Sequence, residues 1–423
     1  MTLDEGWKMK DESLSVSNGL EDFIREHRLD DVRQLALQAS KYADIDVPFA
    51  IQQIDGWQRA RTKLLSWAAH DDILYPPHLA LEQCSSEVTA HYKTEICLRL
   101  LQDFDTMADL TGGMGVDFSF LAPLFRQAHY IEQQAHLCEA AQHNFQVLAI
   151  NNATVTEGDG LEVLSHLPHQ SLVFVDPARR DSHGGRTFAI SDCTPDILPV
   201  LPMLMEKTDL LMVKLSPMLD WHQTAILLDA ACPGALREIH IVATGNECKE
   251  LLVVLDARQH NPSVALHCVN DDNRFVTNTQ EELVLPPCPS LSNIGETATA
   301  SWLYEPNAAI MKAGCFAALA QHFPIRALAD NSHLFVADRH LPDFPGRQLH
   351  ILHTTTTNKK QLREALEGID RANITVRNFP MTADQLRRRL HLADGGDTWL
   401  FASTIGRREH VIFICEKFRS VGV

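Results

Sequence analysis

The sequence lacks the features that would place it in a membrane, in a disulfide scaffold or among zinc-ribbon proteins. Its ten cysteines include no CxxC pair, which argues against a structural zinc site and against a secreted disulfide framework. No apolar run approaches the roughly 18 residues that a membrane-spanning helix needs. The polar start, MTLDEGWKMKDESLS, has neither an apolar signal core nor an Arg-rich transit pattern. These absences predict a cytoplasmic protein.

Charge is unevenly distributed along the chain. The formal net charge is −18, which by itself argues against a nucleic-acid partner. Residues 347–423, however, carry 13 Lys and Arg against 8 Asp and Glu, whereas the remainder carries 24 against 47. A basic C-terminal domain on an acidic body is suited to holding a polyanion locally, although a chance distribution explains the same counts.

Glycine is sparse, at 20 of 423 residues, yet three glycines fall within four positions of ADLTGGMGVDF, residues 108–118. Such clustering indicates a backbone that bends sharply or approaches another group closely. The turn follows a short apolar strand, and Asp109 and Asp117 flank it. The segment is therefore a candidate ligand-binding turn.

Apolar spacing predicts how the chain is organised. Spacings of three and four predict helices in 21–101, where Tyr92 and Lys93 are expected as a packed tyrosine and a surface lysine, with contact to a ligand as the alternative. From residue 102, strands alternate with helices, which predicts a parallel sheet covered on both faces. Seven strands are expected, at TMADL, AHYIEQ, ATVTEG, SLVFVD, DLLMVKL, REIHIVA and ELLVVLD. The last connection is too short for a helical crossover, so the final strand should run antiparallel.

The rest of the chain is less regular. A Pro-rich connector, LPPCPSLSN, precedes an ordered-looking segment around WLYEPNAAIMKAG. A final α+β region has strands at QLHIL and WLFAST and helices at NKKQLREALEG and TADQLRRRLHL. The expected division is a flexible tail at 1–20, a helical region at 21–101, an α/β domain at 102–260, a connector with a small ferredoxin-like segment at 261–345, and an α+β domain at 346–423.

Acidic residues occupy the ends of four successive predicted strands. They are Asp109, Glu132, Asp159 and Asp176. In open parallel sheets, ligands bind beyond the carboxyl ends of strands, near the point where strand order reverses. These carboxylates are therefore expected to line one crevice.

The glycine turn does not match a dinucleotide site. A GxGxxG pattern starting at Gly113 would need a third glycine where Phe118 stands, and the flanking aspartates would repel a pyrophosphate. A ligand that carries an amine and a sulfonium, such as S-adenosylmethionine (SAM), suits the same residues. Asp109 can receive the ammonium, Glu132 both ribose hydroxyls, and Asp159 the adenine amino group.

Four of these stretches, DLTGGMGVD, YIEQ, EGDG and VFVDPAR, resemble motifs I to IV of class I SAM-dependent methyltransferases. The stretches YEPNAAIMKAG and ANITVRNFPMTADQLRRRLHLADGGDTWLFAST resemble a bacterial methyltransferase family with a THUMP-like C-terminal domain. The resemblance implies a Rossmann-like seven-stranded sheet with its last strand antiparallel, an N-terminal helical region and a THUMP-like α+β domain. It also implies SAM as cofactor.

The cofactor-binding residues expected on these motifs are Asp109, Thr111, Gly113, Gly115, Asp117, Glu132, Asp159 and Gly160. One departs from the family pattern. Thr111 stands where many family sequences have the first glycine of the turn, although several RNA methyltransferases also have threonine there.

The DPARR stretch carries the predicted catalytic residues, Asp176, Pro177 and Arg179. Related enzymes use a (D/N)PP(Y/F/W) turn, whose oxygens accept from a base amino group and direct its lone pair toward the methyl group. Positioning is most of the catalytic task. Arg179 replaces the stacking aromatic, so a guanidinium or Phe188 would have to supply the stack, and Arg180 is expected to hold phosphate. A helix N-cap at Asp176 and structural salt bridges at the arginines are the alternatives.

Lys214, Arg387 and Arg388 complete the predicted substrate contacts. Lys214 ends the fifth strand, where it either faces substrate or snorkels at a sheet edge. The arginines either contact RNA phosphate or form a solvated helix face. The histidines show no ligand cluster in the sequence, so no metal is expected. In SDCTPD, Cys193 is expected as a small core or turn cysteine rather than a nucleophile.

The sequence thus predicts a SAM-dependent methyltransferase acting on a base nitrogen of RNA that the THUMP-like domain recruits. Two alternatives stay open. One is a methyltransferase acting on a protein or a small molecule, which the acidic body favours. The other is an RNA-binding protein without catalysis that retains the cofactor pocket.

Overall fold

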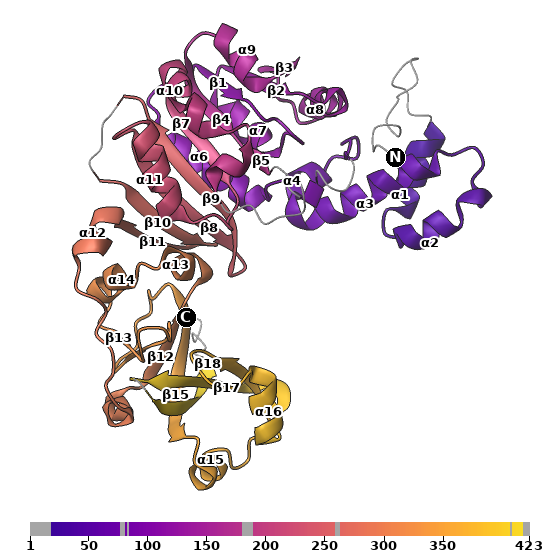
Figure 1. The fold of residues 1–423 in the computed structure, drawn as a ribbon. Helices are drawn as coiled ribbons and strands as arrows, with labels where there is room; N and C mark the ends of the chain where they lie inside the picture. The colour runs from indigo at the N-terminus through magenta and orange to yellow at the C-terminus, as the bar shows by residue number, and fades with distance from the viewer. Residues whose placement is uncertain are drawn as a thin grey trace. The chain divides into compact units, whose positions relative to one another are not determined.

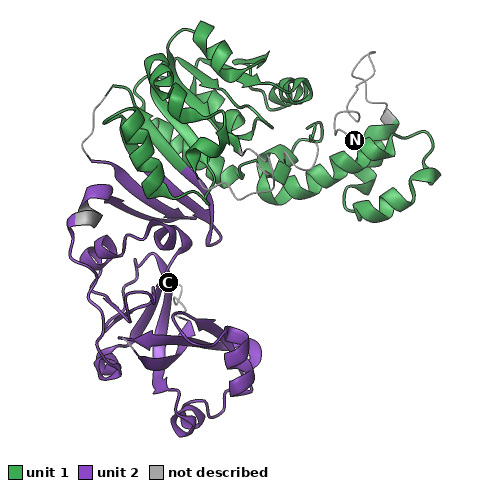
Figure 2. Ribbon diagram, in the orientation of Figure 1, with its two compact units in different colours: residues 1–237, 252–262 green, residues 238–251, 263–423 purple. Residues whose placement is uncertain are grey.

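The structure is a computed structural model of the 423-residue chain, and it describes residues 18–76, 81–82, 84–179, 189–258, 263–406 and 408–417. The chain divides into two compact units (Figure 2). Unit 1 comprises residues 1–237 and 252–262, and unit 2 comprises residues 238–251 and 263–423. The division runs through the two strands of one hairpin.

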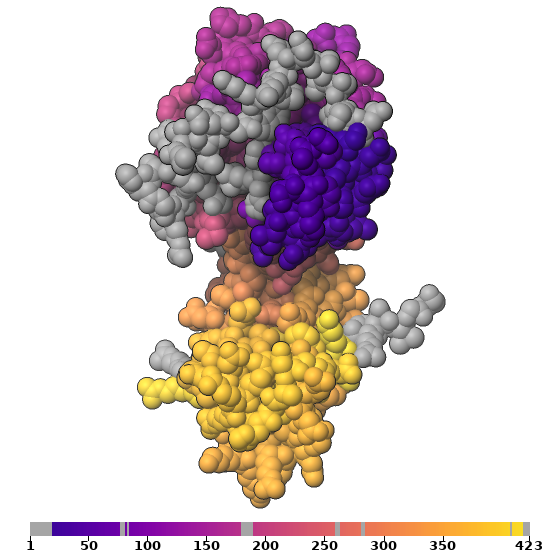
Figure 3. All heavy atoms as spheres, turned by 90° about the vertical axis from the view of Figure 1, so that its right-hand side faces the viewer, coloured from indigo at the N-terminus to yellow at the C-terminus, as the bar shows by residue number. Residues whose placement is uncertain are grey.

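Helices make up the first part of unit 1 (Figure 1). They are α1 (Asn18–His27), α2 (Val32–Leu37), α3 (Val47–Lys63), α4 (Leu65–Ala68) and α6 (Glu87–Leu100). Asp31, Asp46 and Ser86 cap the N-termini of α2, α3 and α6 by accepting from backbone N–H groups. Helices α1 to α3 share a small apolar core, and their compact surface is indigo in Figure 3. The described part of 18–101 contains no strand, as the periodicity predicts.

All seven predicted strands of the α/β region are present. They are β1 (Thr106–Asp109), β2 (Gln127–Glu132), β3 (Ala153–Glu157), β4 (Gln170–Val175), β7 (Thr208–Leu215), β8 (Leu236–Thr244) and β9 (Glu247–Asp256). The connecting helices are α7 (Val116–Leu121), α8 (Ala135–Val147), α9 (Gly160–His166), α10 (Ile197–Lys207) and α11 (Trp221–Ala231). Strands β3, β2, β1, β4 and β7 are neighbours in that order, and all of these pairs are parallel.

Strand order reverses at β1. The chain moves outward from β1 through β2 to β3 and then returns to the other side of β1 with β4 and β7. Open α/β sheets bind their ligands at such a reversal, which here lies at the carboxyl ends of β1 and β4. Every residue of β4 and all residues of β1 except Thr106 are buried.

The sheet differs from the prediction in size. Strands β10 (Ala265–Asn270) and β11 (Asn273–Asn278) extend it to nine strands, in the order β11-β10-β8-β9-β7-β4-β1-β2-β3. Gly245 (φ +56°) and Asn246 (φ +62°) form the two-residue turn between β8 and β9, which makes these adjacent strands antiparallel, as predicted. The edge of β8 that faces away from β9 pairs in parallel with β10. The segment expected as a connector therefore covers an otherwise open sheet edge.

A second, seven-stranded sheet lies in unit 2, in the order β13-β14-β12-β15-β18-β17-β16. Its strands are β12 (Trp302–Pro306), β13 (Arg326–Ala327), β14 (Phe335–Ala337), β15 (Gly346–Thr356), β16 (Arg371–Val376), β17 (Ala393–Ile405) and β18 (Glu409–Lys417). Unit 2 also contains five of the described helices, which are α12 (Thr279–Val284), α13 (Ala308–Ala313), α14 (Phe316–His322), α15 (Lys359–Ala365) and α16 (Ala383–Leu390). Sequence patterns found the strands at QLHIL and WLFAST and the helices α15 and α16. They did not identify β12, β13, β14, β16 or β18 as strands.

Candidate functional site

The predicted acidic residues meet at one edge of the sheet. Asp109 and Glu132 are the last residues of β1 and β2, Asp176 follows β4, and Asp159 lies two residues after β3. Because β3, β2, β1 and β4 are adjacent and parallel, their carboxyl ends share one edge. The tertiary structure therefore assembles the row of carboxylates that the strand pattern predicts.

The glycine turn at this edge is shaped by close contacts. Gly113 (φ +56°) and Gly115 (φ +81°) adopt left-handed backbone conformations, and Gly115 caps helix α7. A Cβ at Gly112 would lie 2.3 Å from the ring of Tyr130, whose hydroxyl donates to the carbonyl of Gly113 at 2.5 Å. A Cβ at Gly113, by contrast, would meet only the carbonyl oxygen of Thr111, at 3.6 Å. One side of the turn is therefore packed on β2, and the side at Gly113 is open.

Glu132 joins β2 to the turn. One carboxylate oxygen accepts from the N–H of Gly113 at 2.9 Å, and the other accepts from the N–H of Gln134 at 3.0 Å. The residue is 9% exposed. A carboxylate offers about four lone-pair sites, so Glu132 can accept further hydrogen bonds from a ligand.

Asp159 and Gly160 begin helix α9. One oxygen of Asp159 accepts from the N–H groups of Leu161 and Glu162, and the other accepts from the side chain of Gln133 at 2.9 Å. A Cβ at Gly160 would lie 2.2 Å from the carbonyl oxygen of Leu110. This glycine lets α9 start directly against the end of β1.

Thr111 connects two of the strand ends. Its hydroxyl accepts from the N–H of Asp176 at 2.7 Å, and its own N–H donates to Asp109 at 3.0 Å. Glycine at this position would lack the hydroxyl. The departure from the family pattern therefore has a structural use, because Thr111 holds the turn after β1 against the DPAR turn after β4.

Asp109 is 2% exposed. Burial raises the pKa of Asp109 to about 8, and the nearby carboxylates of Asp117 and Asp176 add to the rise. The N–H of Thr111 and the ammonium of Lys214 act in the opposite direction. A cationic ligand group beside Asp109 would favour its ionised form.

A buried network of charges lies behind the turn. Lys93 Nζ lies 2.9 Å from Asp117 Oδ1, and Lys214 Nζ lies 3.4 Å from Asp117 Oδ2 and 2.5 Å from Asp176 Oδ2. The hydroxyl of Ser85 donates to Asp117 at 2.7 Å and accepts from both lysines. Two lysines and two aspartates thus balance in charge, and they join helix α6 to the ends of β4 and β7.

Both lysines of this network lie in places that differ from those predicted from the sequence. Lys93 is fully buried, so its interpretation as a surface lysine was wrong. Helical spacing carried a signal, because Lys93 lies on the buried stripe of α6 with Thr89, Ile96 and Leu100. Lys214 is also buried and does not snorkel at a sheet edge, since β7 lies between β4 and β9.

Asp117, expected at the cofactor, contacts Lys93, Lys214 and Ser85 within the protein. Burial acts to raise the pKa of Asp117, but the two lysines and the Ser85 hydroxyl outweigh it and lower that pKa well below its usual value. Asp117 is therefore held ionised by the lysines.

The DPAR turn is held by a two-stranded ribbon. Strand β5 (Ala178–Arg179) pairs antiparallel with β6 (Cys193–Thr194), and Pro177 is buried. Cys193 is 2% exposed, which agrees with its expected place as a core cysteine. The predicted contacts Arg180 and Phe188 lie outside the described residues, and of Arg179 the structure describes the backbone alone.

The arginines of α16 make contacts within unit 2. Arg387 lies 2.9 Å from Asp384 and 2.5 Å from Asp394, while Arg388 donates to the backbone carbonyl of Asp384 at 3.3 Å. Arg387 is thus placed between two carboxylates. Contact of Arg387 or Arg388 with RNA stays a prediction.

A cavity of about 340 Å³ lies in unit 2 beside a buried carboxylate. Glu305 on β12 is 7% exposed and pairs with Arg347 at 3.2 Å and Arg377 at 2.9 Å. Both arginines line the cavity, and the guanidinium of Arg347 lies 4.7 Å from the ring centroid of Trp399. One carboxylate and two guanidiniums leave an excess of one positive charge, a feature that no sequence motif indicated.

The parallel sheet that reverses at β1, the β8–β9 hairpin and the glycine turn bounded by carboxylates define the class I methyltransferase fold. A crystal structure of a candidate methyltransferase from Porphyromonas gingivalis W83 is similar over 95% of this chain and 98% of that chain, with a TM-score of 0.81 and 29% identity. Residues 346–417 match the family described as THUMP domain-like, and residues 302–345 match a ferredoxin-like domain family. The predicted fold, a class I methyltransferase with a THUMP-like C-terminal domain, is confirmed.

Shorter methyltransferase structures match the chain in part. One is a candidate methyltransferase from Streptococcus mutans in complex with S-adenosylhomocysteine (SAH), which covers 39% of this chain and 96% of that chain at 13% identity and a TM-score of 0.31. Another is an rRNA methylase from Streptococcus thermophilus, which covers 39% and 94% at 14% identity and a TM-score of 0.31. No curated protein matches the sequence, and no helix among the described residues is long and apolar enough to cross a membrane.

Proposed function

We propose that the protein is a SAM-dependent methyltransferase. The observation that carries the proposal is the open glycine turn at Gly113, bounded by the buried carboxylate of Asp109 and by Glu132. Carboxylates at this turn suit a ligand with an ammonium and ribose hydroxyls and would repel pyrophosphate. SAM, when bound, supplies a methyl group on a cationic sulfur that is already a good leaving group.

Each carboxylate has a distinct part in this proposal. Asp109 would receive the ammonium, which shifts the buried carboxyl toward its ionised form. Glu132 would accept from the ribose hydroxyls while it keeps its hydrogen bond from Gly113. Asp159, fixed at the start of α9, would accept from the adenine amino group.

We propose a base nitrogen as the methyl acceptor, with Asp176 as the residue that orients it. Lys214 and the hydroxyl of Thr111 hold the aspartate and its backbone in place, so the turn is positioned before substrate arrives. Asp176 would accept a hydrogen bond from the amino group and direct the nitrogen lone pair toward the methyl carbon. Pro177 keeps the turn rigid, and Arg179 would stack on the base.

RNA is the substrate class that we propose. Support comes from the THUMP-like match over 346–417, from the basic surplus of the C-terminal region and from the arginine-lined cavity of unit 2. Arg347 over Trp399 combines a phosphate-binding guanidinium with an aromatic ring, a pairing suited to single-stranded RNA. Arg387 and Arg388 would add phosphate contacts.

Calorimetry with SAM and SAH tests the cofactor site. Glu132→Ala is expected to weaken binding at least tenfold, because one carboxylate accepts from two ribose hydroxyls. Glu157→Ala is the matched control, since Glu157 is exposed and is the register partner of Glu132 on β3. Equal affinity in wild type and Glu132→Ala would remove Glu132 from the site.

Transfer of a radioactive methyl group tests the substrate class. Total RNA, total protein and small-molecule extracts from a strain lacking the protein are each incubated with the enzyme and labelled SAM. Label in RNA supports the proposal, and label in protein or small molecules supports the first alternative. SAM binding without transfer to any of them supports an RNA-binding protein that retains the pocket.

A further inference from the structure

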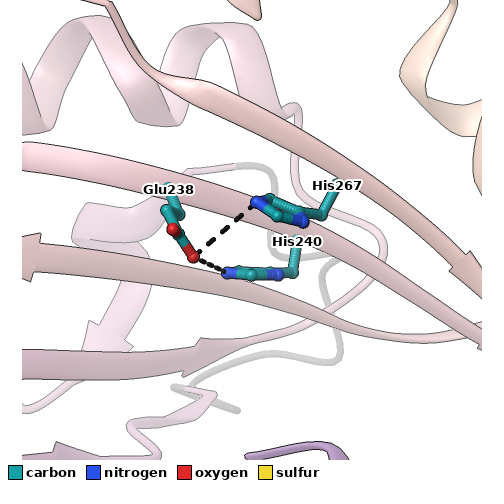
Figure 4. Close-up of side chains that lie close together, drawn as sticks. All are labelled: Glu238, His240 and His267. Carbon is teal, nitrogen blue, oxygen red and sulfur yellow. Dashed lines mark ion pairs between the residues drawn. The ribbon is translucent and has the colours of Figure 1, made fainter. Parts of the chain in front are cut away.

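Three side chains of metal-ligand type converge on strands β8 and β10 of unit 2 (Figure 4). Glu238 and His240 are two residues apart on β8 and so project from the same face of the sheet. His267 on β10 is the register partner of His240 in the parallel pair. One carboxylate and two imidazoles therefore lie on one face, although they come from two strands.

Distances within the cluster are close to those of a metal site. Glu238 Oε2 lies 3.1 Å from Nε2 of His240 and 3.7 Å from Nε2 of His267, and the three ligand atoms all lie within 4.8 Å of one another. Zinc binds imidazole nitrogen and carboxylate oxygen at about 2.0–2.2 Å, so two ligands of a tetrahedral site are roughly 3.4 Å apart. A cation can enter with small side-chain movements.

The three side chains of the cluster are largely shielded from solvent. Glu238 is 4% exposed and His240 is fully buried, while the His267 side chain retains 15% exposure. The two rings stack with centroids 4.4 Å apart and an interplanar angle of 23°, and both Nε2 atoms face the same carboxylate (Figure 4). One histidine is enough to form an ion pair with one carboxylate. Here a second histidine faces the same carboxylate, so the cluster offers three possible metal ligands.

We propose that Glu238, His240 and His267 bind a divalent transition-metal cation, of which Zn²⁺ is the best match to two imidazoles and one carboxylate. A cation held by both imidazoles would lie beside the Glu238 carboxylate, and opposite charge is favourable next to a buried carboxylate. Three protein ligands leave one tetrahedral position for water. The bound metal ties β10 to β8 and so secures the added edge of the nine-stranded sheet, independently of methyl transfer.

Metal analysis of the full-length protein tests this site. The purified chain is stripped with chelator, incubated with Zn²⁺ and desalted, and bound metal is measured by mass spectrometry. Wild type is expected to retain about one equivalent. Co²⁺ is a second probe, because a tetrahedral N/O site gives it visible absorption bands. Titration of the stripped protein with Zn²⁺ is expected to raise its melting temperature.

Conservative variants separate metal binding from folding. His267→Gln and Glu238→Gln should reduce Zn²⁺ affinity by more than the ~10–100-fold typical of changes to groups that only orient metal ligands. His353→Gln, at an exposed histidine of β15, is the matched control and should bind as wild type does. Circular dichroism of stripped His267→Gln checks that the variant folds. No retained metal in wild type, or equal retention in His267→Gln, would overturn the proposal.

Discussion

Lys93 Nζ lies 2.9 Å from Asp117 Oδ1 in the interior of unit 1, where the lysine side chain is fully buried and the aspartate side chain is 8% exposed. Lys93 belongs to α6, the last helix before the α/β region, and Asp117 to α7, which follows the glycine turn. The helical region is therefore bonded directly to the structure that forms the candidate cofactor turn. Lys214 and Asp176 continue the same network to β4.

Lys93→Met should destabilise the protein strongly. Removal of one partner leaves Asp117 short of charge compensation in a buried place, which costs about 3–5 kcal/mol in free energy of unfolding. Urea unfolding of wild type and variant measures this difference in free energy of unfolding. Arg126→Met breaks an exposed ion pair with Asp105 and should cost under ~1 kcal/mol. Similar costs for the two variants would contradict a structural role for the buried pair.

Asp109→Asn should change how stability depends on pH. The pKa of Asp109 is raised in the folded state to about 8, so the folded protein holds a proton that the unfolded chain releases near pH 4. Wild-type stability from this group is full below about pH 4 and is lost progressively up to about pH 8. The free energy of unfolding of the variant should therefore rise relative to wild type between pH 5 and 9.

Urea unfolding at pH 5, 7 and 9 checks this expectation. Asp272→Asn is the control, because Asp272 is exposed and its replacement should give a difference from wild type that stays flat over the same range. A flat difference for Asp109→Asn as well would show that Asp109 is ionised throughout. Both variants retain the charged groups that shift the pKa of Asp109. These are Asp117 and Asp176, which raise it, and Lys214, which lowers it.

Thr111→Val should loosen the DPAR turn. Valine has the shape of threonine but cannot accept from the N–H of Asp176, so the expected cost is about 1–3 kcal/mol. Methyl transfer should fall more than SAM affinity, because Asp176 is proposed to orient the acceptor. Thr154→Val, at an exposed position of β3, should change neither. Parallel losses of SAM binding and transfer would place the effect in the cofactor turn instead.

Gly160→Ala should destabilise the protein, although alanine is the better helix former. The new Cβ would lie 2.2 Å from a backbone oxygen, that of Leu110, which cannot move without shifting the end of β1. The expected cost is roughly 1–3 kcal/mol, read from thermal or urea unfolding. Gly19→Ala in helix α1 meets nothing within 4 Å and should be neutral or stabilising. Equal changes in stability for the two variants would show that alanine at position 160 does not clash with the carbonyl oxygen of Leu110.

Arg347→Gln should weaken RNA binding and its dependence on salt. If Arg347 neutralises one phosphate, the slope of log affinity against log salt should fall by roughly 0.7 for a single strand. Arg363→Gln removes an exposed arginine of α15 and serves as the control for net charge. Filter binding of a single-stranded RNA at several salt concentrations measures both. Identical slopes for the two variants would assign Arg347 a purely structural pairing with Glu305.

Much of the fold was predictable from local patterns. Strand–helix alternation located all seven strands of the α/β region, and a connection too short for a helical crossover identified the hairpin, whose turn the structure places at Gly245 and Asn246. The missed strands β16 and β18 show the limit of such patterns. In β18 the run from Val411 to Cys415 is wholly buried, so it lacks the alternation that marks a half-exposed strand.

The sequence by itself determined the acidic strand ends and the glycine turn, because these features depend on short spacings and on the parallel order of the strands. Only the tertiary structure decided which charges meet. Lys93 and Lys214 reach Asp117 from two other elements, and no spacing along the chain records that proximity. His267 likewise joins Glu238 and His240 only because β10 pairs with β8. Local patterns depend on neighbours along the chain, whereas these clusters depend on which strands and helices pack together.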